Sequence, residues 1–330
     1  MADLGQGHSV RTIGVGQAPR DMVNSADGTA LFVTLRRDDA LGVIDTIEGR
    51  LRARVAVERR PVHVYLHPAG DTIWVGNDLS GSVSVVDVND LEVRANVRTG
   101  NGHRKVAFTP DGDLACVTNI ADGTVSLVDC RTYAVLDDVP SGGRGPHGID
   151  YSILSGRMYV CNGRDGTVGI IDPRARKLVR SIRVGKNAQS VHFTHDGRYG
   201  YVSNGGEARV TVIDASDDSI ATTVDVGAGP DAVAFSSDDR RAYVAGTRTD
   251  SLSVIDVTTH TPIANVPVGS AGSAGMHRQV AISRYGEYVS VPNPEEATVS
   301  VVSTRELRVV ATLAVGDGCG AMCFVGPREG

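Results

Sequence analysis

Histidine followed directly by arginine occurs twice in this chain of 330 residues, as His103-Arg104 and as His277-Arg278. Each pair comes after small residues, TGNG in the first case and GSAGSAGM in the second, and another histidine, His147, follows SGGRGP. Guanidinium groups bind carboxylate and phosphate through paired donors, while a histidine with a near-neutral pKa transfers protons. Neighbouring arginines lower the pKa of a histidine and favour its neutral, basic form. These residue types therefore predict proton-transfer chemistry on an anionic small molecule.

The elements that would position these residues are repeated strands. Six segments, GVIDT, SVVDV, SLVDC, GIIDP, TVIDA and SVIDV, recur every 42 or 43 residues, and SVVST follows the last of them by 47. Each unit has four short runs rich in Val, Ile, Tyr and Phe, separated by turns such as PDG and HDG. Four antiparallel strands in about 42 residues are typical of one propeller blade. The sequence therefore predicts an all-β fold, a single seven-bladed β-propeller domain over residues 1–330.

Both ends of the chain carry strand patterns. The chain opens with SVRTIGVG (residues 9–16), which matches an outer strand, and ends with CGAMCFV (residues 319–325), which matches an inner strand. We expect one of these segments to complete the blade at which the termini meet.

The second strand of each unit, in variants such as CVTN, YVCN and YVSN, resembles the motif that names the YVTN family of β-propeller repeats. The resemblance covers nearly the whole chain, from about residue 10 to about residue 325. It implies the propeller fold but little about function, because the repeated residues belong to strands and turns. It also implies export, as for most of the family, whereas the N-terminal MADLGQGHSVRTIGVG lacks the basic-then-apolar layout of a secretory signal.

Composition and charge narrow the class of partner. The chain has 33 Lys and Arg against 39 Asp and Glu, and its net charge of -6 argues against a nucleic-acid binder. No apolar run approaches the ~20 residues that a membrane-spanning helix needs. Five cysteines, an odd number, fit free buried thiols in a reducing compartment better than disulfides. We therefore expect a cytoplasmic protein with no nucleic-acid or membrane partner.

The loop that leads from the outer strand of one blade to the inner strand of the next lies beside the axis of a propeller. We use its version in the sixth unit, VGAGPDAVAF (residues 226–235), as the reference. At the position of Pro230, the other units carry Pro19, Pro61, His103, Pro146, Ala188 and His277. At the position of Asp231, they carry Arg20, Val62, Arg104, His147, Gln189 and Arg278. Because the seven versions converge on the axis, we predict His103, His147 and His277 as catalytic residues. The predicted substrate-binding residues are Arg20, Arg104, Arg278, Gln189 and Asp231.

Charged residues dominate the other loop on this face, between the second and third strands, and we interpret most of them as a solvated rim. Glu207 and Glu295 are the candidates there for an acid or base, and Glu207 joins the predicted catalytic residues. His63 and His192 lie further along inner strands, where they either reach the channel or pack between blades. No role is predicted for the histidines near the opposite face or the terminus, His8, His67, His195 and His260.

The longest repeat interval has five extra residues, all between Gly269 and His277. Glycine and serine make this segment flexible, so it is either a lid over the axial pocket or a tolerated surface insertion.

Three functions remain open for such a site. The first is an enzyme acting on a carboxylate- or phosphate-bearing metabolite, with lyase, hydrolase or condensation chemistry such as a Pictet–Spengler cyclisation. The second is a divalent metal site formed by His103, His147 and His277, although the adjacent arginines oppose a cation. The third is a non-catalytic ligand- or protein-binding platform, which predicts an exposed apolar patch. No cofactor is required by any sequence motif, and the Ser nucleophile, P-loop and dinucleotide signatures are absent.

Overall fold

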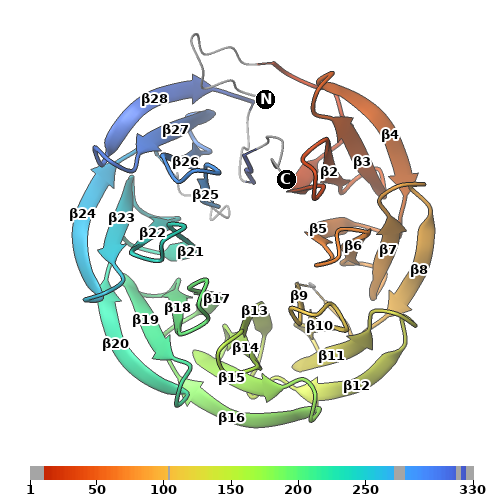
Figure 1. Cartoon of the computed structure of the whole chain (residues 1–330), viewed down its shortest axis with the longest axis horizontal. Helices are drawn as coiled ribbons and strands as arrows, with labels where there is room; N and C mark the ends of the chain where they lie inside the picture. The colour runs from red at the N-terminus through yellow and green to blue at the C-terminus, as the bar shows by residue number, and fades with distance from the viewer. Residues whose placement is uncertain (1–10, 103–104, 271–278, 317–320, 325–330) are drawn as a thin grey trace.

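The computed structural model describes residues 11–102, 105–270, 279–316 and 321–324, and these form seven four-stranded antiparallel sheets around one axis (Figure 1). The predicted all-β fold with seven blades is confirmed. In each sheet the strands follow one another in sequence order from the axis outward. The described residues hold no helix, and so none that is long and apolar enough to cross a membrane.

The strands of the seven blades have closely matched bounds. The inner strands are β1 (Pro19–Asn24), β5 (Pro61–Leu66), β9 (Val106–Phe108), β13 (Pro146–Ser152), β17 (Ala188–Phe193), β21 (Pro230–Phe235) and β25 (Ala281–Ile282). The second strands are β2 (Ala30–Leu35), β6 (Thr72–Asn77), β10 (Leu114–Asn119), β14 (Arg157–Asn162), β18 (Tyr199–Asn204), β22 (Arg241–Gly246) and β26 (Tyr288–Asn293). The third strands are β3 (Ala40–Asp45), β7 (Ser82–Asp87), β11 (Thr124–Asp129), β15 (Thr167–Asp172), β19 (Arg209–Asp214), β23 (Ser251–Asp256) and β27 (Thr298–Ser303). The outer strands are β4 (Arg50–Ala56), β8 (Val93–Arg98), β12 (Val135–Pro140), β16 (Lys177–Arg183), β20 (Ser219–Asp225), β24 (Thr261–Pro267) and β28 (Arg308–Ala314).

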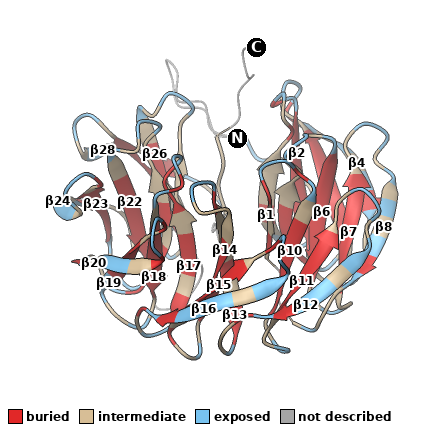
Figure 2. Cartoon of the chain, turned by 60° about the horizontal axis from the view of Figure 1, so that its bottom comes forward, coloured by how far each residue is buried: buried red, intermediate tan, exposed pale blue. Residues whose placement is uncertain are grey.

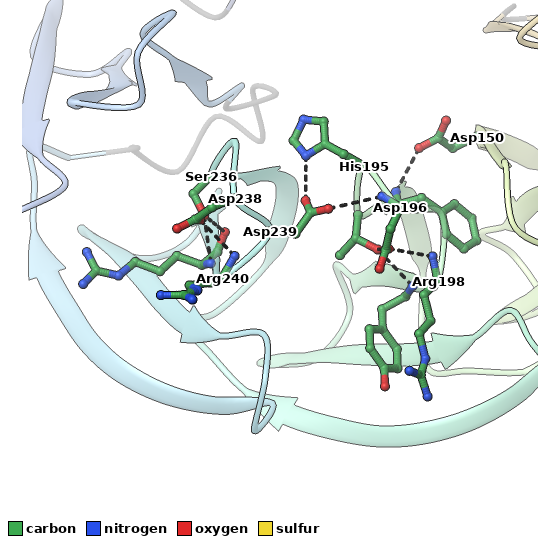
Figure 3. Close-up of polar contacts among 12 residues, drawn as sticks. Asp150, His195, Asp196, Arg198, Ser236, Asp238, Asp239 and Arg240 are labelled. Atoms are coloured by element: carbon green, nitrogen blue, oxygen red, sulfur yellow. Dashed lines mark hydrogen bonds and ion pairs between the residues drawn. The ribbon is translucent and has the colours of Figure 1, made fainter.

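The hairpin between the first two strands is fixed by a short side chain and an aspartate. In the fifth blade, Thr194 Oγ1 donates to Asp196 Oδ1 at 2.6 Å, and the Arg198 N–H donates to the same oxygen at 2.9 Å. Gly197 then takes a positive φ of 73°, a conformation that glycine adopts without strain. The next blade repeats the arrangement with Ser236, Asp238 and Arg240, as Figure 3 shows for both hairpins.

The repeated aspartate at the end of each third strand caps the turn that follows. Asp45 Oδ1 accepts the N–H groups of Ile47 and Glu48 at 2.9 and 2.8 Å. Ser303, the one exception, accepts the Glu306 N–H through its hydroxyl at 3.2 Å. The most regular feature of the sequence is thus a turn-forming residue.

The core lies between neighbouring blades, because each face of a sheet is covered by the adjacent blade on that side. The second and third strands are almost wholly buried, and their largest enclosed side chains include Trp74, Tyr159, Tyr201 and Tyr243. The outer strands are largely exposed, as in β16, which Figure 2 shows at the surface mostly in pale blue and tan.

The expectation that one chain end completes a blade is wrong for the described residues. The first and last blades, β1–β4 and β25–β28, are each built from four consecutive strands. The segment 321–324 instead crosses the seam between them without forming a strand. Asn24 Nδ2 donates to the Phe324 carbonyl at 2.7 Å, and the Met322 N–H donates to Gln279 Oε1 at 3.4 Å.

Candidate functional site

The loops between outer and inner strands and those between second and third strands meet on one face, which we call the loop face. The turns of the opposite face, between the other strand pairs, form the hairpin face. Hydrogen bonds join the two loops within each blade, as between the Arg36 N–H and the Ala18 carbonyl at 3.2 Å. The inner strands therefore begin on the loop face and line the axis from there.

Each of five inner strands begins with a β-bulge against its neighbour. The pairing shifts between Pro19 and Met22, between Pro146 and Ile149, and equivalently in β5, β17 and β21. The predicted substrate-binding residues Arg20, Gln189 and Asp231 lie inside these bulges, and so does the predicted catalytic residue His147. Bulges often occur beside active sites because they redirect a side chain.

Three predicted site residues, His147, Gln189 and Asp231, lie on successive blades. His147 Nδ1 is 3.0 Å from the carbonyl oxygen of Gln189 in the next blade. The Asp231 carbonyl in turn accepts the Ser190 hydroxyl. Asp231 is buried, with 9% of its surface exposed, while His147, Gln189 and Arg20 are half-buried. Their neighbours in the prediction, His103, Arg104, His277 and Arg278, and most of the predicted lid lie outside the described residues.

Glu207 lies on the loop face, where Oε1 accepts the Lys186 N–H at 3.1 Å. The corresponding carboxylates of other blades join the same two loops in the same way, namely Asp38, Asp122, Asp165 and Glu296. Glu207 also borders a surface hollow of about 400 Å³ with Arg209 and Asp225. The contact with Lys186 gives Glu207 a scaffold position that four other blades share, and its predicted role as an acid or base stays a prediction.

Deeper along the axis, Asp21 is held from two blades. Asp21 Oδ2 is 2.9 Å from His63 Nδ1 and accepts the Val64 N–H at 3.4 Å, while Gln279 Nε2 donates to Oδ1 at 3.4 Å. Burial raises the pKa of Asp21, but the hydrogen bond and positive charge of His63, together with the hydrogen bond from the Met22 N–H, hold the pKa below its ordinary value. The charge of Lys105 acts in the same direction. His63 is buried and bonds to Asp21 of the neighbouring blade, which fits the alternative of packing between blades.

Asp150 occupies the next level of the inner strands. Its Oδ1 accepts the Tyr151 N–H at 2.8 Å, and its Oδ2 accepts the Phe193 N–H of β17 at 3.0 Å (Figure 3). Burial nevertheless raises the pKa of Asp150 to about 6. A carboxylic acid in this range exchanges protons near neutral pH.

His192 stands at the matching level of the neighbouring blade and is half-buried. Burial lowers the pKa of His192 to about 4, helped by the positive charge of Lys105 and opposed by Asp231. No hydrogen bond joins its side chain to another of the described residues. His192 is therefore a neutral imidazole at pH 7, beside the backbone that holds Asp150.

The histidines on or near the hairpin face connect blades. His67 Nε2 is 2.9 Å from the Gly112 carbonyl, His195 Nδ1 is 2.6 Å from Asp239 Oδ1, and His260 Nδ1 is 2.8 Å from the Tyr201 hydroxyl. These contacts fit the absence of any predicted chemical role.

No group of three or more His, Cys, Asp or Glu within the described ranges could hold a metal ion. The predicted alternative of a metal bound by His103, His147 and His277 depends on two residues outside those ranges. It therefore stays a prediction.

Sequence comparison between the blades missed Asp21, Lys105 and Asp150. Beyond the positions of Pro230 and Asp231, only the histidines His63 and His192 were considered, although the position after Asp231 also holds Asp21 and Lys105 in other blades. Two residues further along, the blades carry Val23, Tyr65, Ala107, Asp150, His192, Ala234 and Ala281. Asp150 and His192 stand at a position where the other blades carry Val, Tyr or Ala, and this contrast was the signal in the sequence that could have identified Asp150.

Comparisons with known proteins bear on the fold. Residues 109–228, a little over a third of the chain, match the family described as cytochrome D1 heme domain. No curated protein matches. Among solved structures, hydrazine synthase of Kuenenia stuttgartiensis is similar at 20% identity and a TM-score of 0.72, over 91% of this chain and 98% of that one. The dihydro-heme d1 dehydrogenase NirN in complex with DHE is similar at 16% identity and a TM-score of 0.72, over 91% of this chain and 66% of that one. At these identities the likeness shows the fold alone.

Proposed function

We propose that the axial site binds a carboxylate- or phosphate-bearing small molecule and acts on it by proton transfer. The observation that carries this proposal is the pair formed by Asp150 and His192 on adjacent blades. The pKa of the carboxyl is raised to about 6, and the pKa of the imidazole is lowered to about 4. Titratable groups whose environments displace their pKa values in opposite directions are typical of acid–base sites.

The roles of the two groups follow from these values. Near pH 6, Asp150 is present both as the acid and as the carboxylate, so it can give or take a proton. His192 stays neutral and acts as a hydrogen-bond partner or base. Burial, helped by the positive charge of Lys105, lowers the pKa of His192, and the Lys105 ammonium would pair with an anionic group of the substrate. Lyase, hydrolase and condensation reactions all require such proton transfers.

Haem is one carboxylate-bearing molecule that the comparisons favour. The matched family is described as a heme domain, and the NirN structure is titled as a dihydro-heme d1 dehydrogenase. The chain has residues that fit this group: Arg20 and Lys105 would hold carboxylates, and His192 offers a neutral imidazole of the kind that ligates iron. A bound haem would supply redox chemistry at its iron.

The protein-binding alternative receives less support. Of the ten large exposed apolar side chains of the described residues, five stand in loops. The other five, Val135, Val179, Ile220, Ile263 and Val310, stand singly on the outer strands of five separate blades, so they do not gather into the expected apolar patch. Ile47, Leu79 and Tyr285 belong to three different blades, and Ile153 and Leu154 form one isolated pair.

Two finer assignments belong to the same proposal. The motifs CVTN, YVCN and YVSN support placing the chain among YVTN-type repeat proteins. A reducing, cytoplasmic location is supported by Cys116, Cys130, Cys161 and Cys323, which are all free.

The proposal is tested by finding a ligand and then changing the pair. Carboxylate- and phosphate-bearing metabolites, with hemin among them, are screened by thermal shift, and each ligand found is assayed for turnover by mass spectrometry. We expect Asp150→Asn and His192→Gln to lower turnover at least about a hundredfold while ligand binding persists. His195→Gln, on the hairpin face, is the matched control and should retain full turnover. Equal turnover by Asp150→Asn and the unmodified protein contradicts the proposal.

A further inference from the structure

Four arginines gather on the loop face where the first two blades meet. Arg20 lies in the bulge of β1, Arg36 and Arg37 follow β2, and Arg60 directly precedes β5. The positive charges of Arg60, Arg20 and Arg37 all act on Arg36, opposed by the negative charge of Asp78. This arrangement, which we call the arginine cluster, concentrates positive charge beside the axis of a protein whose net charge is negative.

Arg36 is the central member of the arginine cluster. Its Nε is buried and has no hydrogen-bond partner among the described residues. Burial is the main cause of a lowered pKa of Arg36, and the neighbouring guanidinium groups add to it. A buried donor without a partner costs free energy, so an acceptor supplied by a ligand would offset that cost.

The carboxylates near the arginine cluster are already engaged. Asp38 Oδ2 accepts the Gln17 N–H at 2.8 Å, and Asp39 Oδ1 accepts the Arg60 N–H at 2.8 Å. Asp78 Oδ2 is 3.6 Å from Arg60 Nε. Within the described ranges, no carboxylate forms a salt bridge with the side chain of Arg20, Arg36 or Arg37.

We propose that Arg20, Arg36, Arg37 and Arg60 form an anion-binding subsite that takes a carboxylate or phosphate group. The proposal rests on the proposed function in one respect, since the anion is taken to belong to the molecule that reaches Asp150 and His192. Arginine suits this task because its planar fork of donors matches either anion through two parallel hydrogen bonds. The subsite thereby gives the axial site an anchor on the side of the first two blades.

Titration calorimetry of the full chain with citrate, inorganic pyrophosphate and uncharged glycerol tests the subsite. We expect binding of one or both anions, no binding of glycerol, and weakening by added salt. Arg36→Gln should weaken anion binding roughly tenfold or more, as expected for loss of a charge-assisted pair of hydrogen bonds. Arg36→Lys retains the charge but not the fork, so an intermediate loss is expected. Preference for citrate over pyrophosphate, or the reverse, distinguishes carboxylate from phosphate recognition.

Arg176→Gln is the matched control, because Arg176 is an exposed arginine in a turn of the hairpin face. It removes the same charge and should leave anion binding unchanged. The exposed Arg37 provides Arg37→Gln as a second variant if Arg36→Gln fails to fold. The proposal is overturned if neither anion binds at millimolar concentration, or if Arg176→Gln weakens binding as much as the cluster variants.

Failure of the subsite is distinguishable from failure of the proposed function. Asp150→Asn should leave citrate and pyrophosphate affinity unchanged, because Asp150 lies at a deeper level than the arginine cluster. Anion binding together with turnover that is indifferent to Asp150 would retain the subsite and reject the proton-transfer function.

Discussion

Asp21 Oδ2 lies 2.9 Å from His63 Nδ1 across the boundary between the first two blades. The other oxygen of Asp21 accepts Gln279 of the last blade at 3.4 Å. One carboxylate in β1 therefore connects to β5 and to a residue just before β25 of the last blade, at the seam where the two ends of the propeller meet. In a fold whose blades otherwise touch mainly through apolar side chains, this is a polar junction at the axis.

Replacing Asp21 should destabilise the ring. Asp21→Asn removes the charge that His63 faces and leaves buried donors poorly matched, so we expect a loss of about 3 kcal/mol in the free energy of unfolding at pH 7. The pKa of Asp21 is lowered in the folded state, so its stabilising contribution is present above the unfolded value of 3.8 and is lost as pH falls through the folded value. Chemical unfolding at pH 7 and at pH 3 measures both effects.

A matched pair on the hairpin face provides the control. His67 Nδ1 is 3.1 Å from Asp71 Oδ1, but the Asp71 side chain is 59% exposed. Solvent screens such a pair, so Asp71→Asn should cost less than about 1 kcal/mol. Equal losses in the free energy of unfolding for Asp21→Asn and Asp71→Asn would show that the contact between Asp21 and His63 does not stabilise the ring more than an exposed pair does.

Asp150 should give the opposite dependence on pH. Because burial raises the pKa of Asp150 to about 6, the folded protein binds a proton more tightly there than the unfolded chain does. Stability from this group is therefore fully present below the unfolded value of 3.8 and falls as pH rises to about 6, by at most about 3 kcal/mol. Asp150→Asn should remove that slope, and melting temperatures measured between pH 4 and pH 7 would reveal it.

The exposed Asp113 offers a comparison for this slope. Asp113→Asn should preserve the dependence on pH that Asp150→Asn removes. If Asp150→Asn keeps the slope of the unmodified protein, the carboxyl is not the group that titrates near pH 6.

The fold was predictable because its determinants are local. Six of the seven blades repeat the aspartate cap of the third strand, and Asp45 and Asp196 make their contacts within a few residues of themselves. Seven copies of such a unit leave a closed ring as the only consistent arrangement of sheets. The ends of the chain were mispredicted because strand-like residues, such as those at 321–324, bind across the seam without pairing in a sheet.

The candidate site was only partly predictable because its contacts join blades. Comparison of repeats identified the position in the unit that holds His147 and Asp231, and the structure shows that this position lies in a β-bulge. It did not show that Asp150 reaches the backbone at Phe193, 43 residues away. Nor did it show that the charge of Arg60 acts on Arg36, because this depends on how the loop of one blade meets that of the next.

Asp218 is a structural feature that only the fold reveals. It is 4% exposed in the turn between β19 and β20, where its carboxylate accepts hydrogen bonds from Arg157 and from the Tyr159 hydroxyl of the preceding blade. Asp218→Ala should cost about 3 kcal/mol, because it leaves both donors without their acceptor. Arg176→Ala is the control, since Arg176 occupies the same left-handed turn position, at a φ of 52° against 60° for Asp218, and is exposed. Comparable unfolding curves for the two variants would contradict this assignment.

Gly148 sets how closely β13 approaches β17 at the axis. A Cβ added there would stand 2.5 Å from the Gln189 carbonyl oxygen and 2.6 Å from the Ser190 Cα, both backbone atoms that cannot move cheaply. Gly148→Ala should therefore separate the two strands and weaken the contact of His147 Nδ1 with Gln189, at a cost of about 1–3 kcal/mol. We expect a lower melting temperature and, in a protein that still folds, weaker binding of any axial ligand.

Gly14→Ala is the matched substitution for this test, because nothing lies within 4 Å of a Cβ at Gly14. It should leave both the melting temperature and ligand affinity unchanged, which separates the effect of the contact from that of losing a glycine. If Gly148→Ala melts at the temperature of Gly14→Ala and binds ligand equally well, the close approach of these two blades does not shape the axial site.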